Sequence, residues 1–343
     1  MQSALGTQSL EARINEAGGP VSMMRSSQLG PPVPGIFPAI PSEFTSWRDE
    51  VRAWKDSVAL LEQSYHMEEV HLRGRDVIAF LNGLGINKFD PFPVLRGKHL
   101  VVCAADGNLI GDTVLFHEEP DFYRAVGIPP AHNWLMFHAG RTHLDVTAEQ
   151  HQNYVLRAAP RDVFRIEIQG PLAHTLVSEV AGATLPEVKF FHIGEFRIAG
   201  KPVRALRHGM AGTPGFEIYG RWDDQHAVRE ALEIAGEKYG LRKVGALAYS
   251  TTAQESGWLP APLPAIYAGA AMREYREWMQ GLSFEGLASL AGSLVSERIE
   301  DYYLDPLEAG YGGFIDWNRD FIGRDALKAR AAQPQRRKVT LEW

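Results

Sequence analysis

A glycine-rich stretch with one acid is the first candidate for chemistry. Residues 206–220 read LRHGMAGTPGFEIYG, and Glu217 is the single acid in the apolar run that ends it. A carboxylate between Phe216 and Ile218 is costly to bury unless it is paired or hydrogen-bonded. Two parallel N–H bonds from a flat heterocycle would meet that need. A hairpin in which glycine supplies positive φ and Pro214 stiffens the turn is the alternative interpretation.

The bulk composition limits the classes of function. The chain has 343 residues, of which 45% are hydrophobic and 22% charged, which is typical of a soluble globular protein with two or more domains. The net charge of −7 argues against nucleic acid as the main partner, because no basic surplus exists to neutralise phosphates. No segment has the apolar length of a membrane span, and the N-terminus has no apolar signal core. We therefore expect a cytoplasmic protein with neither membrane nor nucleic acid as a partner.

Several familiar kinds of site are missing from the sequence. There is no phosphate-binding loop, no glycine fingerprint that opens a helix and no Gly-x-Ser-x-Gly elbow. Cys103 is the only cysteine, and no two histidines have helical metal spacing, so we expect no metal site. What remains must use a small cofactor or none.

Two segments share one order of elements. Residues 69–85 predict a short strand, a glycine at Gly74 and an amphipathic helix, and residues 165–182 repeat this pattern around Gly170. Each unit is followed by further strands and a second helix. The repeated order predicts an internal duplication, with two similar α+β halves that face each other. Ligands often bind where such halves meet.

The segments outside these units complete the expected organisation. Five prolines between positions 29 and 44 favour extended chain, and a helix is expected to begin after Ser46 with Val58 and Leu61 on its apolar face. The expected division is an irregular segment at 1–42, a first α+β half at 43–150, a second at 151–245, and a loop-rich segment at 246–343 that completes the site and leads into a truncated C-terminal domain.

The glycine-rich stretch resembles a family signature. Its spacing is similar to the Arg-x-Gly-Tyr-x-Gly-Glu-x-Gly-Tyr-Glu signature of the glycine-cleavage T-protein family. The matching positions are Arg207, Gly209, Gly212, Gly215 and Glu217. The segments IQGPLA at 168–173 and EAGYGGFIDWNRDFIGRDAL at 308–327 resemble further family segments in the same order.

The resemblance implies a fold and a cofactor. The fold would be α+β, with two similar folate-binding halves and with the family's C-terminal barrel-like third domain largely missing from this chain. The cofactor would be tetrahydrofolate, with Glu217 on its pteridine ring. The other cofactor-binding residues that it implies are Arg207, Gln169 and Trp258.

Within the family, the chain resembles the tetrahydrofolate-dependent aryl O-demethylases of the vanillate and syringate type. The stretches NWLMFHAG at 133–140 and ESGWLPAPLPAIYAG at 255–269 are close to that branch. In its members, a tyrosine at the position of Tyr249 and a histidine at the position of His66 hold the substrate oxygens. The resemblance thus implies these two as catalytic residues. The implied substrate-binding residues are Phe37, Ile128 and His99.

The implied reaction moves a methyl group from a lignin-type methoxy-aromatic to N5 of tetrahydrofolate. Displacement at the methyl carbon leaves a phenolate, which something must stabilise or protonate. Tyrosine has a reference pKa of about 10, close to that of a simple phenol, so proton transfer between them is nearly thermoneutral. Most of the catalysis would then be positioning in a site without water.

Departures from the family pattern keep alternatives open. Gly111 replaces an acid of the aminomethyltransferases and Tyr249 an arginine, which argues against aminomethyl transfer. Ile128 replaces the arginine that pairs with the carboxylate of vanillate, and Arg124 or Arg141 would have to substitute for it. The pocket is then more apolar, which favours a neutral methoxyphenol. The alternatives are an aminomethyltransferase, a methylenedioxyphenyl-cleaving enzyme and a non-catalytic folate-binding module.

Overall fold

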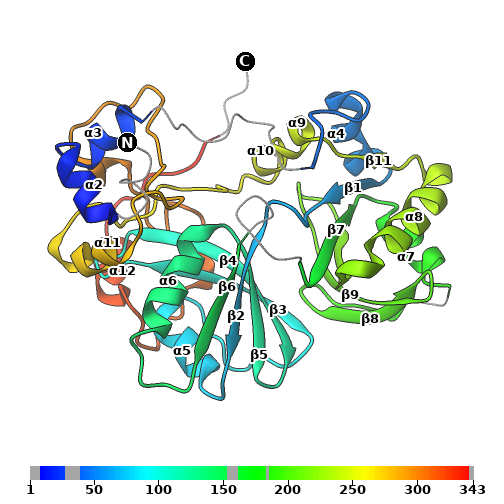
Figure 1. Cartoon of the computed structure of the whole chain (residues 1–343), viewed down its shortest axis with the longest axis horizontal. Coiled ribbons are helices and arrows are strands. Elements are labelled where there is room, and N and C mark those ends of the chain that lie inside the picture. Colours follow the sequence, from blue (N-terminus) through cyan, green and yellow to red (C-terminus); the bar gives the residue numbers. More distant parts are fainter. Residues whose placement is uncertain (1–7, 28–38, 153–160, 183–184, 340–343) are drawn as a thin grey trace.

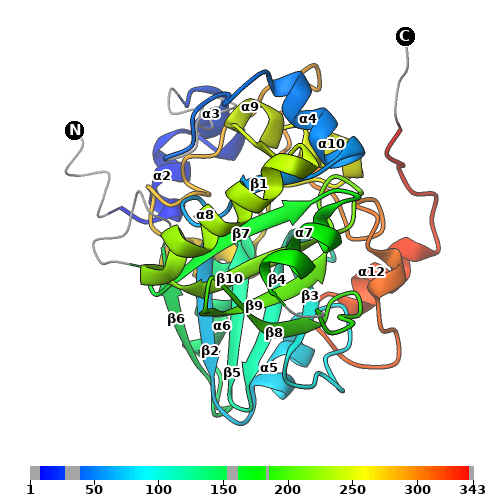
Figure 2. The ribbon, with the colours of Figure 1, turned by 90° about the vertical axis from the view of Figure 1, so that its right-hand side faces the viewer.

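Two β-sheets face each other, and helices cover the outer face of each (Figures 1 and 2). The computed structural model describes residues 8–27, 39–152, 161–182 and 185–339. The five-stranded sheet has the order β3 (Arg96–Cys103), β4 (Leu109–Glu119), β5 (Phe122–Gly127), β2 (Glu68–Arg73), β6 (Thr147–His151). The six-stranded sheet has the order β11 (Arg242–Lys243), β1 (Ala59–Glu62), β7 (Val163–Gln169), β10 (Gly215–Arg221), β9 (Lys201–His208), β8 (Ile193–Ile198).

Each sheet buries one face under its own pair of helices. The helices α5 (Val77–Leu84) and α6 (Pro129–Ala139) pack on the five-stranded sheet, and α7 (Ala173–Val180) and α8 (Gln225–Gly236) pack on the six-stranded sheet. Strand β7 shows how the sequence does this. Its apolar residues at alternate positions join the core under α7 and α8, so its polar residues at the intervening positions face the other sheet.

The predicted duplication is confirmed by the topology. Both units run strand, helix, three strands and helix, and the four strands of each unit have the same order in their sheet. Gly74 and Gly170 hold equivalent positions, with φ of 132° and 125°. A Cβ on them would lie 2.0 Å from the Asp145 carbonyl oxygen and 2.6 Å from the Ser57 carbonyl oxygen. Only glycine fits this turn in either half.

The two halves exchange their leading strands. Strand β1 precedes the first unit but pairs antiparallel with β7 of the second. Strand β6 precedes the second unit but pairs antiparallel with β2 of the first. The ranges 43–150 and 151–245 stay a prediction as domains, although β1, which falls in the first range, lies in the second sheet.

Two expectations for the N-terminal part were wrong. Residues 1–42 are not all irregular, because α2 (Leu10–Glu16) and α3 (Pro20–Arg25) form there, and the Ser9 side chain accepts a hydrogen bond from the Ala12 N–H at 3.2 Å. The next helix, α4 (Trp47–Asp56), ends before Val58, and Leu61 lies in strand β1. All four residues of β1 are buried, so its apolar run fits a strand packed on both faces.

The range 246–343 stays a prediction as a separate segment. The remaining described elements are short helices and 3₁₀ turns. These are α9 (Ala246–Tyr249), α10 (Thr252–Ser256), α11 (Arg273–Trp278) and α12 (Arg324–Ala331), with 3₁₀ turns η1 (Trp222–Asp224), η2 (Glu237–Tyr239), η3 (Ala270–Met272), η4 (Ile299–Tyr302) and η5 (Gly312–Phe314). Helix α11 packs against α2, where Arg276 pairs with Glu11 (Figure 1). Across the part of the chain that the structure describes, no helix has the length and apolar character to cross a membrane.

Candidate active site

Tyr249 and His66 lie in contact although 183 residues separate them in the chain. Tyr249 ends α9, and His66 lies in the turn that carries the chain from β1 to β2. The His66 Nε2 atom is 3.0 Å from the Tyr249 hydroxyl oxygen, and the two rings meet edge to face. The hydroxyl donates to Oε1 of Gln63 at 3.1 Å. The structure therefore brings together the two residues that the sequence implied as catalytic.

The surroundings keep both groups uncharged. Burial raises the pKa of Tyr249, and the nearby carboxylates of Glu167 and Glu217 raise it further. Burial and the charge of Arg161 lower the pKa of His66 to about 3. At neutral pH the pair is thus a neutral phenol and a neutral imidazole. Such a phenol can give a proton to a strongly basic oxygen but does not ionise by itself.

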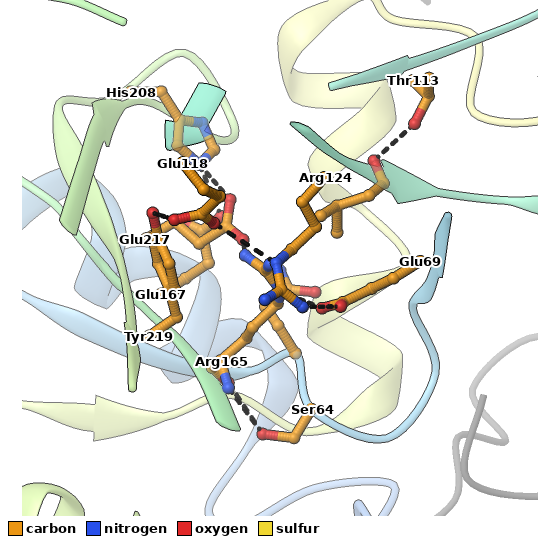
Figure 3. Close-up of polar contacts among 12 residues, drawn as sticks. Ser64, Glu69, Thr113, Glu118, Arg124, Arg165, Glu167, His208, Glu217 and Tyr219 are labelled. Carbon is orange, nitrogen blue, oxygen red and sulfur yellow. Dashed lines mark hydrogen bonds and ion pairs between the residues drawn. The ribbon is translucent and has the colours of Figure 1, made fainter. Parts of the chain in front are cut away.

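A layer of charged side chains lies beside this pair, between the two sheets. Figure 3 shows it, with Glu217, Glu167 and His208 on one side and Glu69 and Arg124 on the other. Glu217 on β10 is buried, as its apolar neighbours predicted. It is not alone there, because Oε1 lies 2.5 Å from an Arg165 Nη1 and Oε2 lies 3.3 Å from the His208 Nε2. Burial raises the pKa of Glu217, but these two cations outweigh burial and hold it below its usual value.

Glu167 is a second acid at the same place. Strand register sets it directly opposite Glu217 across β7 and β10, and its Oε1 lies 2.8 Å from the His208 Nε2. Gln169, two residues further along β7, donates to the other oxygen of Glu167 and accepts from the Met210 N–H at 3.1 Å. Gln169 therefore ties the glycine-rich turn to this pair of acids.

Arg165 joins the layer to the other half. Its Nε donates to Oε1 of Glu69 on β2 at 2.8 Å while its Nη1 binds Glu217. Glu69 also pairs with Arg124, whose Nε lies 3.3 Å from Glu118. The carboxylate implied to bind folate is thus connected, through one guanidinium, to the opposite sheet (Figure 3).

Arg207 is separated from these groups by the sheet itself. It lies opposite Phe216 on β10, and its guanidinium is over the Phe216 ring, 5.4 Å from the centroid. Because neighbouring residues in a strand face opposite ways, His208 points to the charged layer and Arg207 points to the helices. The structure does not bring Arg207 to Glu217, and its implied role in folate binding stays a prediction.

The other implied residues lie apart from this layer. Trp258 is partly exposed, and its Nε1 donates to the Tyr311 hydroxyl at 2.9 Å. His99 on β3 is 2.6 Å from Asp112 through Nε2, and its ring meets the Tyr311 ring edge to face. Ile128 is the residue that precedes α6. Phe37 lies outside the described residues, and the roles of all these residues stay predictions.

Neither arginine considered as a replacement partner for a substrate carboxylate is available for it. Arg124 is buried among Glu69 and Glu118. Arg141 is 2.8 Å from Glu274, with much of both side chains exposed.

The sequence analysis missed four members of the site, namely Gln63, Arg165, Glu167 and His208. A signal for two of them was present in VFRIEIQ, where polar and apolar residues alternate. That pattern predicts a strand with one face in solvent, whereas β7 is covered on both faces. His208 lies in the glycine-rich stretch beside Gly209. The glycine spacing there predicts a turn and gives no signal for a buried, charged histidine.

A cavity of about 550 Å³ opens beside His208. It lies between the segment that leads into β8 and the glycine-rich turn. Its lining consists of Glu187, Val188, Lys189, Phe190, Arg207, His208, Gly209, Gly212, Thr213 and Pro214.

Glu167, His208 and Glu217 also have one ligand atom each within 4.8 Å of the others, a spacing that a metal ion would accept. Arg165 already neutralises Glu217, so a cation is less favoured there, and the absence of a metal stays a prediction.

Comparisons with curated proteins identify three kinds of relative. Syringate O-demethylase from Sphingobium sp. (strain NBRC 103272 / SYK-6) is 41% identical over 97% of this chain and 72% of its own length. Sesamin methylene transferase from Sinomonas sp. (strain No.22) is 30% identical over 79% of this chain. An aminomethyltransferase from Caldanaerobacter subterraneus subsp. tengcongensis is 27% identical over 80% of it. This chain spans only 58% and 63% of the last two proteins.

Comparison with solved structures confirms the expected α+β fold of the T-protein type. The glycine cleavage system aminomethyltransferase T from Bartonella henselae matches with a TM-score of 0.60 at 15% identity, over 84% of this chain and 67% of that one. A comparison with protein families gives a consistent result. The model of the GCVT N-terminal domain matches residues 22–261 of this chain. This chain is a member of the GCVT N-terminal domain family.

Proposed function

We propose that this protein is a tetrahydrofolate-dependent O-demethylase that acts on a lignin-type methoxy-aromatic, similar to vanillate, syringate or guaiacol. The observation that carries the proposal is the partly buried contact between Tyr249 and His66, held by Gln63. The 41% identity to syringate O-demethylase supports the same reaction. The residues present fit the cofactor, because Glu217 is an ionised, buried carboxylate that can accept N–H groups of a pterin.

The proposed chemistry exchanges a methyl group and a proton. Bound tetrahydrofolate supplies N5 as the methyl acceptor. When the methyl–oxygen bond breaks, its electron pair stays on the aryl oxygen, and the Tyr249 hydroxyl donates a hydrogen bond that stabilises this oxygen. His66 holds the tyrosine oxygen in place. The methylated cofactor would release the N5 proton, so the products would be a phenol and the N5-methyl folate.

The site residues have separate roles in this proposal. Tyr249 and His66 hold the substrate oxygens, and Glu217 and Gln169 hold the folate side of the site. Burial excludes water, which strengthens each of these contacts. His99 and Ile128 line the substrate side, and Ile128 favours a neutral substituent because it offers no charge to a carboxylate.

The test is mass spectrometry of tetrahydrofolate after anaerobic incubation with the protein and single aromatics. The panel is vanillate, syringate, guaiacol, a neutral para-substituted guaiacol and a methylenedioxybenzene. We expect 5-methyltetrahydrofolate with a methoxy-aromatic, and a loss of about 10²- to 10⁴-fold in rate for Tyr249→Phe. The matched control is Tyr239→Phe, whose exposed hydroxyl bonds only to Glu179 among the contacts described.

The alternative is methylene transfer, which the 30% identity to sesamin methylene transferase favours. A methylene adduct formed only with the methylenedioxybenzene would establish it. Folate binding without any product would contradict both reactions. An Ile128→Arg variant should gain activity on vanillate, because it restores a cation for the carboxylate.

A further inference from the structure

His208 lies between two carboxylates that strand pairing forces together. Glu167 and Glu217 are directly opposite each other on β7 and β10, an arrangement in which like charges repel. The His208 Nε2 is 2.8 Å from Glu167 and 3.3 Å from Glu217. Arg165 contacts Glu217 from the other side, so among the described residues His208 is the cation that contacts both acids.

His208 is also the contact between Glu217 and the cavity. Of the ten residues that line the cavity, His208 alone pairs with Glu217. A side chain too small to fill this place would open the carboxylates to the cavity and to water. His208 therefore places a positive charge beside Glu217 and separates its carboxylate from the water in the cavity.

Other titratable groups around His208 lie on three other elements. Arg165 lies on β7, Tyr249 on α9, and Glu187 and Lys189 line the cavity in the segment before β8. Arg207, the preceding residue, faces the other side of the sheet. Burial lowers the pKa of His208, but Glu167 and Glu217 outweigh it and raise that pKa to about 10.

We propose that His208, held by Glu167, is a positioning residue for the folate-binding carboxylate of Glu217. His208 fixes the second oxygen of Glu217 and keeps the two acids ionised side by side. A reduced pterin presents N–H donors, so the receiving carboxylate must carry no proton. The inference rests on the proposed function, and it adds Glu167 and His208 to the residues that recognise the pterin.

The experiment measures the Kd of tetrahydrofolate at pH 6 and pH 8, anaerobically, by fluorescence titration. In His208→Gln the size is similar but the positive charge is gone. We expect affinity to fall about tenfold at pH 8 and more at pH 6, because the unscreened acids raise the pKa of one another. Wild type should bind similarly at both pH values, and kcat at saturating folate should change less than KM.

Two variants and one control sharpen the measurement. His208→Lys keeps a cation and should recover part of the affinity. Glu167→Gln should raise the Kd by a smaller factor, because His208 loses its closer partner. The control is His192→Gln near the cavity, where the side chain contacts the Phe190 carbonyl and neither of the two acids among the contacts described.

The outcomes separate this inference from the proposed function. If His208→Gln binds folate as wild type does at both pH values, the inference is overturned and the proposed function stands. A loss that is equal at both pH values would give His208 a packing role only and would also overturn the inference. If wild type itself binds no tetrahydrofolate, both proposals fall. Circular dichroism and Tm of each variant confirm that folded protein is compared.

Discussion

The two halves place opposite charges at equivalent positions of one scaffold. Glu69 and Arg165 each stand five residues before the equivalent glycines Gly74 and Gly170. In the first half the position carries an acid and in the second half a base, and the two side chains bind each other at 2.8 Å. Equivalent positions of the first strand in the two halves thus supply the two partners of one ion pair between the sheets.

The neighbouring strands differ in the same way. Register sets Arg124 opposite His71 in the first half, and Glu217 opposite Glu167 in the second half. Arg124 is buried, and its charge is neutralised by Glu69 and Glu118 of its own sheet. Glu217 has the equivalent place in the other sheet but carries a carboxylate, whose charge raises the pKa of Tyr249. We infer from the comparison that this position joins charged groups within the first half, whereas in the second half it carries the carboxylate proposed to bind folate.

Replacing each of these two residues should separate the roles, with the largest effect on stability. Arg124→Met leaves Glu69 and Glu118 buried with fewer partners, and should lower the free energy of unfolding by about 3–5 kcal/mol. Its folded fraction should still bind tetrahydrofolate within about twofold of wild type. Urea unfolding followed by circular dichroism measures the first quantity and titration of folate measures the second.

Glu217→Gln should show the reverse pattern. Removing one charge-assisted acceptor should weaken folate binding by about 100-fold, with a smaller loss in the free energy of unfolding. If Arg124→Met lost folate binding as strongly as Glu217→Gln, the two equivalent positions would not have the separate roles that we infer.

The next test concerns the equivalent glycines. A Cβ at Gly74 would meet backbone oxygen at 2.0 Å and at Gly170 at 2.6 Å, each with φ that side chains rarely adopt. We expect Gly74→Ala to lower the free energy of unfolding by about 3 kcal/mol and Gly170→Ala by about 2 kcal/mol. The control is Gly83→Ala inside α5, where nothing lies within 4 Å and stability should rise slightly. If all three variants behaved alike in thermal unfolding, neither turn would require glycine.

Local patterns were enough to predict the repeated units but not how they are combined. The strand–glycine–helix pattern around Gly74 and Gly170 is short-range, so the sequence predicted it correctly. Strand β1 was taken for the end of a helix, because a run of four buried residues has no period and its partner β7 is a hundred residues away. The packing of one half on the other decided its structure.

The candidate site divides in a similar way. Tyr249, His66 and Glu217 were implied by resemblance, and the contact between the first two could not come from periodicity. Arg165 and Glu167 looked like the solvent face of a half-buried strand. Their burial follows from the facing sheet. Glu69 of that sheet pairs with Arg165, while Glu217 and His208 of their own sheet pair with Arg165 and Glu167, and these contacts are a property of tertiary structure.

The halves should also respond to pH in opposite directions. His208 has a folded pKa of about 10 against an ordinary value of 6.5, because Glu167 and Glu217 outweigh its burial. Its contribution is complete below pH 6.5 and is lost as pH rises towards 10. His132, buried in α6 of the first half, has its pKa lowered by burial to about 4. The unfolded chain therefore binds an extra proton there below pH 6.5, and stability is lost as pH falls towards 4.

The measurement is the free energy of unfolding from urea titrations between pH 4 and pH 10. His208→Gln should flatten the alkaline side, by about 2 kcal/mol. His132→Gln should reduce the acid slope instead. A slope that stayed the same in either variant would assign that pH dependence to other groups.

The smallest expected effect separates two consecutive residues. Arg207 and His208 follow each other on β9, but strand alternation turns Arg207 away from Glu217 and onto the Phe216 ring. Arg207→Met keeps a long apolar stem over that ring, so it should change the free energy of unfolding by less than about 0.5 kcal/mol and the Kd of folate by less than about twofold. Folate titration beside His208→Gln at one pH makes the comparison. A tenfold loss in Arg207→Met would mean that the cofactor extends into the cavity both residues line, and the side of the sheet would no longer decide which residues bind it.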